Sequence, residues 1–368
     1  MLIKNLVLKN YRNYDDLFVE FNDKLNIFIG NNAQGKTNIL ESIYVLAVTK
    51  SYLGVGDKDL IKFNRDFFDI KAKIFGNGSS KKLEIKLLNN KKKVFINDKE
   101  IRKFRDYVSN LNVIIFSPDN IRMIKDGPSV RRKFLNVEIS QILNRYVLLM
   151  NDFNCILHQR NEVLKQQGNI NKIYLEIIND KFISLAVDIC IERKKFIDLI
   201  NEKIVGIFKD ITTIDGLNLK YNCSFKLDED RKISISNLKT KIDEAFEREC
   251  RYGNSLYGPH KDDFSFFIDD KDLAIFGSQG QMRSAILALK LSEIGVFKEY
   301  TDDYPILLLD DIFSELDVMK RNNLIKYISE NVQTIITTTD LNMINDVLVK
   351  DANIFEIDDG KIIGNNGK

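Results

Sequence analysis

The chain has 368 residues, 44% of them apolar and 29% charged, which is the composition of a folded protein with an ample core. Lysine and arginine (55) nearly balance aspartate and glutamate (53), which excludes binding through a very high net charge but not through a local basic surface. The first ten residues lack the apolar block of a signal peptide, and no apolar run is long enough to span a bilayer. We therefore expect a cytoplasmic protein without a membrane partner.

The chain begins with short strands. Residues 2–9 and 17–21 alternate apolar and polar side chains around a polar turn, and the apolar run 25–29 suits a strand buried on both faces. A glycine-bounded loop follows this run directly. Apolar residues then recur at helical spacing over residues 39–47, so the predicted order is strand, loop and helix.

The middle of the chain changes character twice. Residues 68–101 alternate between Asn-rich turns, which predicts an antiparallel meander, and residues 111–118 read as another buried strand. Residues 119–215 show helical periodicity, no clear strand and no sustained heptads, which predicts a compact helical lobe. The remaining predicted elements are strands at 219–227, 262–269, 306–309, 333–337 and 352–358, with helices at 236–250, 281–300, 318–330 and between the last two strands.

The cysteines and histidines give little support for a metal site, disulfides or a catalytic triad. The cysteines are far apart and form no C-x-x-C pair, so we expect inert thiols rather than a zinc site or disulfides. His158 and His260 are the only histidines, which leaves little for histidine-based metal chemistry or a Ser-His-Asp hydrolase. The four cysteines are Cys155, Cys190, Cys223 and Cys250.

A phosphate-binding loop is the clearest motif. Residues 30–37 fit G-x-x-x-x-G-K-[ST] in full, between a predicted buried strand and a predicted helix. Backbone N–H groups and the helix N-terminus of such a loop cradle phosphate, and the glycines allow close approach. Lys36 is expected to reach the β- and γ-phosphates and Thr37 to place its hydroxyl on Mg²⁺. The expected ATP-binding residues are Gly30, Asn31, Asn32, Ala33, Gln34, Gly35, Lys36, Thr37 and Asn38.

A second candidate segment of the nucleotide site lies far along the chain. The apolar run 306–309 ends in Asp310 and Asp311, and a carboxylate at the end of a buried strand faces the nucleotide crevice. We expect Asp310 to hold Mg²⁺ through water, and Asp311 to orient or deprotonate the attacking water. Lys36, Asp310 and Asp311 are thus the predicted catalytic residues.

Two further motifs flank this strand. An S-x-G-Q helix opening precedes it and S-x-L-D follows it, which is the order found in ABC-type ATPase heads with a long insertion. In such heads the S-x-G-Q element caps the γ-phosphate held by a second subunit, so that ATP joins two heads. Alternatively, Ser278 is an ordinary helix N-cap. The signature residues are Ser278, Gln279, Gly280 and Gln281, and the D-loop residues are Ser314 and Asp317.

The sequence resembles the RecF family, whose members are bacterial recombination-repair proteins with an ABC/SMC-type head, over nearly the whole chain. The resemblance rests on the motifs above and on strings at residues 8–14, 116–119, 127–135, 159–161 and 257–263. G-P-x-x-R-R-x-F-L, Q-R-N and G-P-H-K-x-D are specific to the family, whereas the P-loop and S-x-L-D are shared by all SMC-like heads.

The resemblance implies an α/β fold, an ABC-type ATPase head (a P-loop sheet plus an antiparallel β-meander) with an inserted α-helical lobe. We expect residues 1–118 and 216–368 to form the head, lobe I, and residues 119–215 to form the helical lobe, lobe II. Arg12, in the first β-turn, is expected to contact the nucleotide as in SMC-like heads. His260 is expected to be an ordered loop residue near the nucleotide or the head–lobe junction rather than a catalytic base.

The implied function is ATP-dependent DNA binding in recombinational repair. Such proteins dimerise on ATP and Mg²⁺, bind duplex or gapped DNA largely without sequence specificity, and work with RecR and RecO to help load RecA at gaps. Asp311 stands where ABC proteins have glutamate, and no switch histidine follows, which implies a slow, DNA-stimulated ATPase used as a reset. The alternatives are an ABC/SMC-like ATPase subunit coupled to a different partner, and a P-loop phosphotransferase, which leaves the S-x-G-Q motif unexplained.

Three basic runs are candidates for contacts with DNA phosphates, although each could equally be a solvated face. Arg131 and Arg132 could also be structural, because they lie between Pro128 and an apolar helix. The chain departs from the family at Ser51-Tyr52-Leu53-Gly54, which lacks an arginine, and at Asn136, where aspartate is common. The basic runs are Lys91-Lys92-Lys93, Arg131-Arg132-Lys133 and Arg193-Lys194-Lys195.

Overall fold

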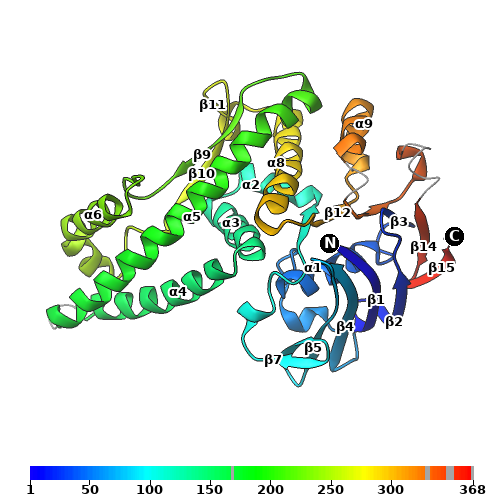
Figure 1. Cartoon of the computed structure of the whole chain (residues 1–368), viewed down its shortest axis with the longest axis horizontal. Coiled ribbons are helices and arrows are strands. Elements are labelled where there is room, and N and C mark those ends of the chain that lie inside the picture. Colours follow the sequence, from blue (N-terminus) through cyan, green and yellow to red (C-terminus); the bar gives the residue numbers. More distant parts are fainter. Residues whose placement is uncertain (167–169, 328–331, 345–351, 366–368) are drawn as a thin grey trace. The chain divides into compact units, whose positions relative to one another are not determined.

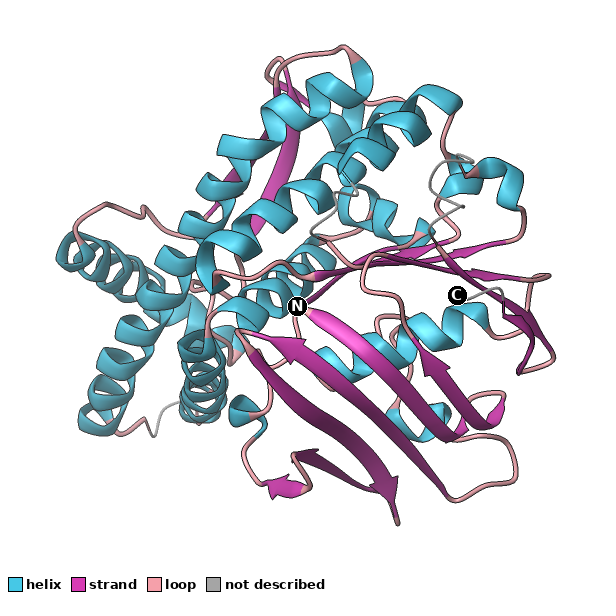
Figure 2. Cartoon of the chain, turned by 45° about the vertical axis from the view of Figure 1, so that its right-hand side comes forward, coloured by secondary structure: helices cyan, strands magenta, loops and turns pink. Residues whose placement is uncertain are grey.

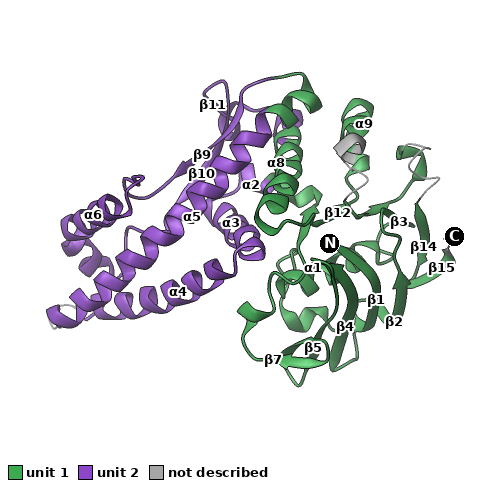
Figure 3. Cartoon of the chain, in the orientation of Figure 1, with its two compact units in different colours: residues 1–121, 206–214, 283–368 green, residues 122–205, 215–282 purple. Residues whose placement is uncertain are grey.

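A computed structural model of the chain describes residues 1–166, 170–327, 332–344 and 352–365. These residues form two units, coloured green and purple in Figure 3. Unit 1 comprises residues 1–121, 206–214 and 283–368, and unit 2 comprises residues 122–205 and 215–282. Within the described residues, no helix combines the length and the apolar run that crossing a membrane requires.

An antiparallel sheet forms one layer of unit 1, with the strand order β2-β1-β4-β5-β6-β7. Alternate residues of its strands are buried, as in β4, where Phe68, Ile70, Ala72 and Ile74 face the core. This sheet confirms the predicted meander. Its strands are β1 (Leu2–Tyr11), β2 (Tyr14–Glu20), β4 (Phe67–Gly76), β5 (Ser79–Leu88), β6 (Lys91–Ile96) and β7 (Lys99–Ile101).

The second sheet of unit 1 carries the P-loop strand, in the order β15-β14-β3-β13-β12-β8. Neighbours from β14 to β8 are parallel, and β15 pairs antiparallel with β14. The strand β15 was not predicted; an Asp359-Gly360 turn with positive φ at both residues connects it to β14 as a hairpin. The strands are β3 (Leu25–Ile29), β8 (Val113–Phe116), β12 (Ile306–Asp310), β13 (Thr334–Thr338), β14 (Asn353–Asp358) and β15 (Lys361–Asn365).

Helix α1 (Lys36–Val48) lies between the two sheets of unit 1 (Figure 2). It contacts β4 and β5 of the antiparallel sheet and β8, β12 and β13 of the parallel sheet. Burial on all sides explains why its apolar residues do not form a single stripe. The last residues of the P-loop, which begin this helix, therefore lie in the centre of unit 1.

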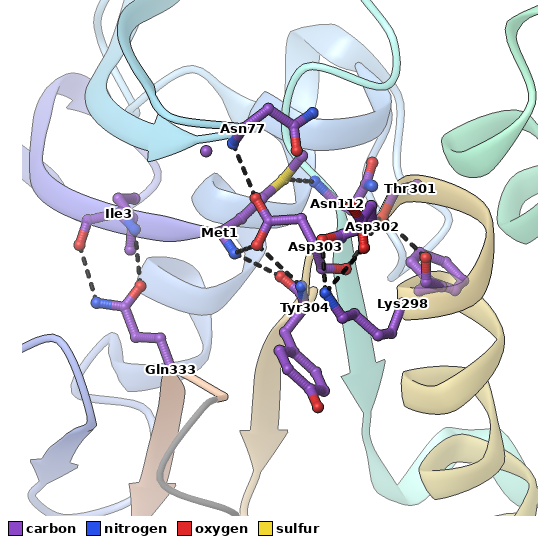
Figure 4. A network of polar contacts seen from close by, with 12 residues as sticks. Met1, Ile3, Asn77, Asn112, Lys298, Thr301, Asp302, Asp303, Tyr304 and Gln333 are labelled. Carbon is purple, nitrogen blue, oxygen red and sulfur yellow. Dashed lines mark hydrogen bonds and ion pairs between the residues drawn. The ribbon is translucent and has the colours of Figure 1, made fainter.

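Polar contacts also join the two sheets near the first strand (Figure 4). The side-chain amide of Gln333, fully buried, accepts from the backbone N–H of Ile3 (2.7 Å) and donates to its carbonyl (2.9 Å). The amino group of Met1 donates to Asp303 Oδ1 (2.5 Å) and to the Tyr304 carbonyl (2.6 Å). These bonds fix β1 relative to β12 and β13.

Unit 2 consists mainly of helices with one small sheet, in the order β11-β10-β9 (Figure 1). The longest helix, α5, has 41 residues. In the described residues, the helices that lie mainly in unit 2 are α2 (Arg122–Lys125), α3 (Pro128–Ile142), α4 (Asn144–Leu164), α5 (Lys172–Thr212), α6 (Arg231–Tyr252) and α7 (Leu273–Phe276). The small sheet has β9 (Leu217–Asn222), β10 (Asp263–Ile268) and β11 (Lys271–Asp272). Helix α8 (Gln279–Thr301) continues from unit 2 into unit 1, and α9 (Val318–Tyr327) belongs to unit 1. Short 3₁₀ helices span Asp57–Leu60, Phe104–Asp106, Pro118–Ile121, Phe313–Glu315 and Leu341–Met343.

The unit boundary after the helical stretch differs from the predicted one. The sequence places residues 216–282 in the head, whereas the structure places them in unit 2. The reason is tertiary pairing: β9 pairs with β10, and Asn201 of α5 exchanges two hydrogen bonds of 2.8 Å with the backbone of Leu219. The predicted helix before residue 352 and the end of the predicted helix 318–330 fall largely outside the described residues.

Candidate nucleotide-binding site

The glycine-bounded loop has the backbone of a phosphate cradle. Gly35 has φ of 111°, and a side chain there would collide with the amide of Asn13. Ala33 also has a positive φ, of 66°. No side chain caps the N-terminus of α1. The positive end of the α1 dipole is therefore open to an anion.

Lys36 lies at the base of this loop and is almost buried, with 6% of its surface exposed. Its ammonium donates to the carbonyl oxygens of Gly30 (2.5 Å) and Asn31 (2.8 Å). Burial lowers the pKa of Lys36, and the nearby charges of Asp311 and Asp310 oppose that shift. A cation held by neutral carbonyls and close to two carboxylates can exchange those carbonyls for phosphate oxygens.

Asp310 meets Thr37, although 273 positions separate them in the sequence. The Thr37 hydroxyl donates to Asp310 Oδ1 (2.9 Å), and so does the Thr337 hydroxyl (2.8 Å). Tyr52 donates to the other oxygen, Oδ2, at 2.8 Å. The structure thus joins the two predicted magnesium ligands, Thr37 and Asp310, and adds two hydroxyl donors that the sequence did not indicate.

Asp311 has a left-handed backbone conformation, with φ of 50°. Its N–H donates to the Thr337 hydroxyl (3.0 Å), whereas its own Oδ1 is buried and accepts no hydrogen bond within the described part of the chain. Burial raises the pKa of Asp311, while Lys36 lowers it. A carboxylate with a free oxygen and a raised pKa is suited to accepting a proton from water.

The β1–β2 turn supports the loop with residues that the sequence analysis did not single out. Asn13 donates to the Gln34 carbonyl and accepts from Asn38, both at 2.9 Å, and the Tyr14 hydroxyl donates to the Gly35 carbonyl at 3.1 Å. The one available signal was that both belong to the string at residues 8–14. The β14–β15 turn adds a bond from the Asp359 N–H to Gln34 Oε1 (2.6 Å).

Arg12 has a different partner from the predicted nucleotide. Its guanidinium makes two bonds of 2.7 Å to Glu41 of α1 and one of 3.0 Å to the Asp59 carbonyl. Glu41 is fully buried and also accepts from Tyr11 (3.0 Å) and Ser51 (2.5 Å). Arg12 therefore neutralises the buried carboxylate of Glu41 below the P-loop. Its contact with a nucleotide stays a prediction.

The signature residues open α8 as a capping box. Ser278 Oγ accepts from the Gln281 N–H (3.2 Å), and Gln281 Oε1 accepts from the Ser278 N–H (2.9 Å). Ser278, Gln279 and Gly280 are exposed. The N-cap role is thus present, and exposure leaves the same residues accessible to a second molecule.

The predicted D-loop residues have local partners. Ser314 Oγ donates to the Asp311 carbonyl at 2.7 Å, which ties this segment to the end of β12. Asp317 accepts from the backbone N–H of Lys320 at 3.0 Å at the start of α9. Both are exposed.

The first basic run is partly neutralised. Lys92 donates to Asp57 (2.8 Å) and to the Thr49 carbonyl, and Lys93 pairs with Glu100 at 3.1 Å. Lys91 is exposed. Only part of this run therefore carries charge that DNA phosphates could use.

The second basic run is mostly structural. Arg131 makes bonds of 2.6 and 2.9 Å to both oxygens of Asp263, and Arg132 donates to the Asp262 carbonyl at 2.9 Å. Lys133 is exposed. The geometry favours the structural alternative for Arg131 and Arg132.

Comparisons with known proteins agree on one family. A family model described as "RecF/RecN/SMC N terminal domain" matches residues 2–362. A protein of Ligilactobacillus salivarius (strain UCC118) named DNA replication and repair protein RecF is 37% identical over 374 residues, covering 100% of this chain and 98% of that protein. The chain belongs to the RecF family. A RecF of Lactobacillus johnsonii is 38% identical over 370 residues, with 98% of this chain and 99% of that protein covered.

Solved structures give the same result for the fold. Two RecF structures, described as RecF-ATP and RecF-ATPrS in the RecFOR pathway, are 30% identical to this chain. Their TM-scores are 0.91 and 0.90, and at least 99% of this chain and 98% of each structure are covered. An Smc head domain from Pyrococcus furiosus is 15% identical with a TM-score of 0.52 and shares the fold alone. These matches confirm the predicted fold class.

The RecF-specific strings build the core of unit 2 rather than the nucleotide site. Arg160 of Q-R-N is fully buried and donates to Glu249 and Ser255, both at 2.6 Å. Its Nε donates to Asn179 (2.7 Å), and its guanidinium lies 5.0 Å from the centre of the Phe182 ring. A buried cation with these partners is structural.

A second buried arginine corrects one prediction. Arg193, which the sequence analysis placed in a basic run for DNA, is 1% exposed and donates to the Pro259 carbonyl (2.6 Å). It also donates to Asn136 (2.9 Å), which accepts from Tyr146 as well (2.9 Å). Asp262 lies 3.5 Å from Arg193 and supplies the negative charge that the neutral Asn136 does not. The reason for the error is that charge runs in a sequence do not reveal burial.

Other predicted side chains of unit 2 also lie in its core. The His260 ring packs near Phe153 and Phe182, and its Nε2 lies 3.0 Å from the Ser255 carbonyl. Cys190 and Cys223, distant in sequence, place their sulfur atoms within 4.8 Å of each other and of an Asp262 oxygen. Burial raises the pKa of Cys190 well above its usual value, so this thiol stays protonated.

Proposed function

We propose that this chain is an ATP-dependent switch of DNA repair, which dimerises on Mg²⁺-ATP and then holds duplex or gapped DNA. The bond between Thr37 and Asp310 carries this proposal, because it joins the P-loop to the carboxylate of a strand 273 positions away. The relatives named DNA replication and repair protein RecF, and the structures of RecF with ATP in the RecFOR pathway, support it. RecR, RecO and, indirectly, RecA are the partners proposed on the same basis.

The residues of the P-loop fit a magnesium nucleotide. Burial of an ammonium among carbonyls, an uncapped helix N-terminus and a glycine cradle are the features that phosphate binding requires. Lys36 and the first N–H groups of α1 would bind the phosphates, and Thr37 with Asp310 would hold Mg²⁺. Bound Mg²⁺-ATP would supply the phosphoanhydride bond that is hydrolysed, and its Mg²⁺ would neutralise part of the phosphate charge.

Side chains of the protein then determine the rate of ATP hydrolysis. Asp311 is fixed through its backbone N–H to Thr337, and its buried Oδ1 has no hydrogen bond among the described residues. It orients water and accepts its proton, and Lys36 stabilises charge on the phosphate side. Aspartate reaches less far than the glutamate of other ABC proteins, so turnover is slow, as suits a reset.

Two exposed apolar pairs support a homodimer. Ile275 and Phe276, before the signature, are 72% and 70% exposed. Val318 and Met319, which follow the D-loop, are 69% and 59% exposed. Large exposed apolar side chains next to the signature, such as Ile275 and Phe276, are expected at a surface that a second copy covers, and we propose Val318 and Met319 of unit 1 as a separate contact.

DNA contact through phosphates needs unpaired lysines. A groove of about 480 Å³ on the antiparallel sheet is lined by four lysines. Three of them already have partners: Lys71 pairs with Asp69 (2.9 Å), Lys81 donates to Asn110 (2.9 Å) and Lys82 pairs with Asp98 (2.6 Å). Lys73 is exposed. We propose that the exposed Lys73 and Lys91 of unit 1 and, independently, Lys133 of unit 2 contact DNA phosphates.

Gapped-duplex binding tests the proposal. A fluorescent gapped duplex at ~0.1–0.15 M salt should bind in the presence of Mg²⁺-ATP and far less without it. Lys73→Glu should lower the affinity at every sequence, whereas Lys194→Glu should not, because Lys194 already pairs with Asp198 at 2.6 Å. DNA binding that ignores ATP would overturn the switch and favour an ATPase subunit coupled to a different partner.

The dimer is tested at the signature. Ser278→Asp keeps an N-cap but places negative charge where the partner's γ-phosphate would lie, so it should abolish ATP-dependent dimerisation measured by light scattering. Ser278→Arg should do the same, with loss of the cap. Ser236→Arg, an equally exposed serine of unit 2, is the matched control and should dimerise normally. Dimerisation of Ser278→Asp at wild-type ATP concentrations would contradict the proposal.

A further inference from the structure

The second oxygen of Asp310 has a partner 258 positions away in the sequence. Tyr52 Oη donates to Asp310 Oδ2 at 2.8 Å, while Oδ1 accepts from Thr37 and Thr337. A carboxylate can rotate about its last bond, and rotation moves both oxygens together. A donor fixed on Oδ2 therefore fixes the direction in which Oδ1 faces.

The loop that carries Tyr52 is itself fixed. α1 ends at Thr49, which has φ of 63° and donates its N–H to the Val45 carbonyl (2.7 Å). Ser51 Oγ then donates to the buried Glu41 (2.5 Å) and accepts from the Leu53 N–H (3.1 Å). The residues before and after Tyr52 are thus hydrogen-bonded to each other, and Ser51 anchors them to Glu41.

The ring of Tyr52 is held as well. Tyr44 packs edge-on against it, with ring centroids 5.4 Å apart and an interplanar angle of 75°. A tyrosine hydroxyl is a hydrogen-bond donor, and the carboxylate oxygen Asp310 Oδ2 is its acceptor at 2.8 Å. The hydroxyl is therefore a donor at a fixed point.

We propose that Tyr52 is a positioning residue of the nucleotide site, whose hydroxyl holds Asp310 Oδ2 so that Oδ1 faces Thr37 and the magnesium ion. This inference rests on the proposed function, since it concerns the ion that Asp310 would hold. Tyr52 touches neither the phosphates nor the water in this assignment and acts only through Asp310. Partners of this kind commonly change metal affinity by about 10- to 100-fold when removed.

The test is a magnesium titration of nucleotide binding. Fluorescent mant-ATP is bound to the full chain at increasing Mg²⁺, and the half-saturating Mg²⁺ concentration is read from the fluorescence. Tyr52→Phe should raise that concentration about 10-fold or more, with binding in EDTA unchanged. Tyr107→Phe is the matched control, because the buried Tyr107 hydroxyl has no hydrogen bond within the described residues and its loss should leave the titration unchanged.

Double variants separate positioning from general damage. In an Asp310→Asn background, Tyr52→Phe should cause no further rise in the half-saturating Mg²⁺ concentration, whereas its effect should persist in an Asp311→Asn background. An equal effect of Tyr52→Phe in both backgrounds would overturn the inference. So would a Tyr52→Phe titration that matches a wild type with normal nucleotide binding, and this result would leave the proposed function intact. A wild type without magnesium-dependent nucleotide binding would overturn both.

Discussion

Acidification should destabilise unit 2 through one imidazole, that of His260. The ring packs near Phe153 and Phe182, and only its Nε2 has a polar partner, the Ser255 carbonyl at 3.0 Å. Nδ1 is buried without a hydrogen bond in the described part of the chain. A second proton on this ring would have no acceptor, so the folded state disfavours the charged form.

The magnitude follows from the difference between the folded and unfolded pKa. Burial lowers the pKa of His260 to about 4, whereas an unfolded histidine titrates near 6.5. Between these values the unfolded state binds more protons, so the free energy of unfolding falls as the pH falls. Linkage over this interval gives a loss of at most about 2 kcal/mol between pH 7 and pH 5.

Urea denaturation at pH 7, 6 and 5 measures this loss. His260→Gln removes the titrating ring, so its free energy of unfolding should fall by about 2 kcal/mol less than that of the wild type over this range. His158→Gln is the control, because His158 is exposed and should leave the wild-type pH dependence in place. Parallel pH profiles for the wild type and His260→Gln would refute the reasoning.

Three other outcomes are expected. Arg160→Met leaves the buried Glu249 unpaired and should lower the free energy of unfolding by about 3–5 kcal/mol, most of which Arg160→Met with Glu249→Leu should restore in urea titrations. Gln333→Leu strands both backbone groups of Ile3 and should cost about 2–4 kcal/mol by the same measurement. Asp311→Asn should keep nucleotide binding and lower ATP turnover by roughly 100-fold in a phosphate-release assay, with the dimer persisting.

Each of these outcomes has a contrary result. A double variant less stable than Arg160→Met alone would mean that Glu249 has another compensating partner. Gln159→Leu, at an exposed position of α4, should lower the free energy of unfolding only slightly. A loss as large as that of Gln333→Leu would mean that the buried hydrogen bonds of Gln333 are not the cause. Normal turnover in Asp311→Asn would mean that another group positions the water.

The sequence predicted the elements around the candidate nucleotide site where local pattern and chemistry coincide. An apolar run, a glycine-bounded loop and a helical repeat identify β3 and α1, and a second apolar run before two aspartates identifies β12. It did not predict Tyr52 or Asn13, whose roles depend on which turns the fold brings to the P-loop. No spacing rule connects Tyr52 to Asp310, because 258 positions separate them.

The larger errors arose where tertiary contacts decide the outcome. Residues 216–282 were placed in the head, but β9 and β10 pair with each other and α5 binds the backbone of β9. Strand β15 exists because β14 offers it a partner. Arg193 has the same sequence appearance as a solvated charge, yet its carbonyl and amide acceptors lie on distant segments. Such partners are invisible to composition and periodicity.

The two kinds of motif in this chain have different roles. The P-loop, Asp310 and Asp311 lie in unit 1, whereas the strings at residues 159–161 and 257–263 supply Arg160 and His260 inside unit 2. Substitutions in the shared motifs should change nucleotide binding at constant stability. Substitutions in the family-specific strings should first change the stability of unit 2, and a loss of DNA binding there is evidence for a DNA contact only after the free energy of unfolding has been measured.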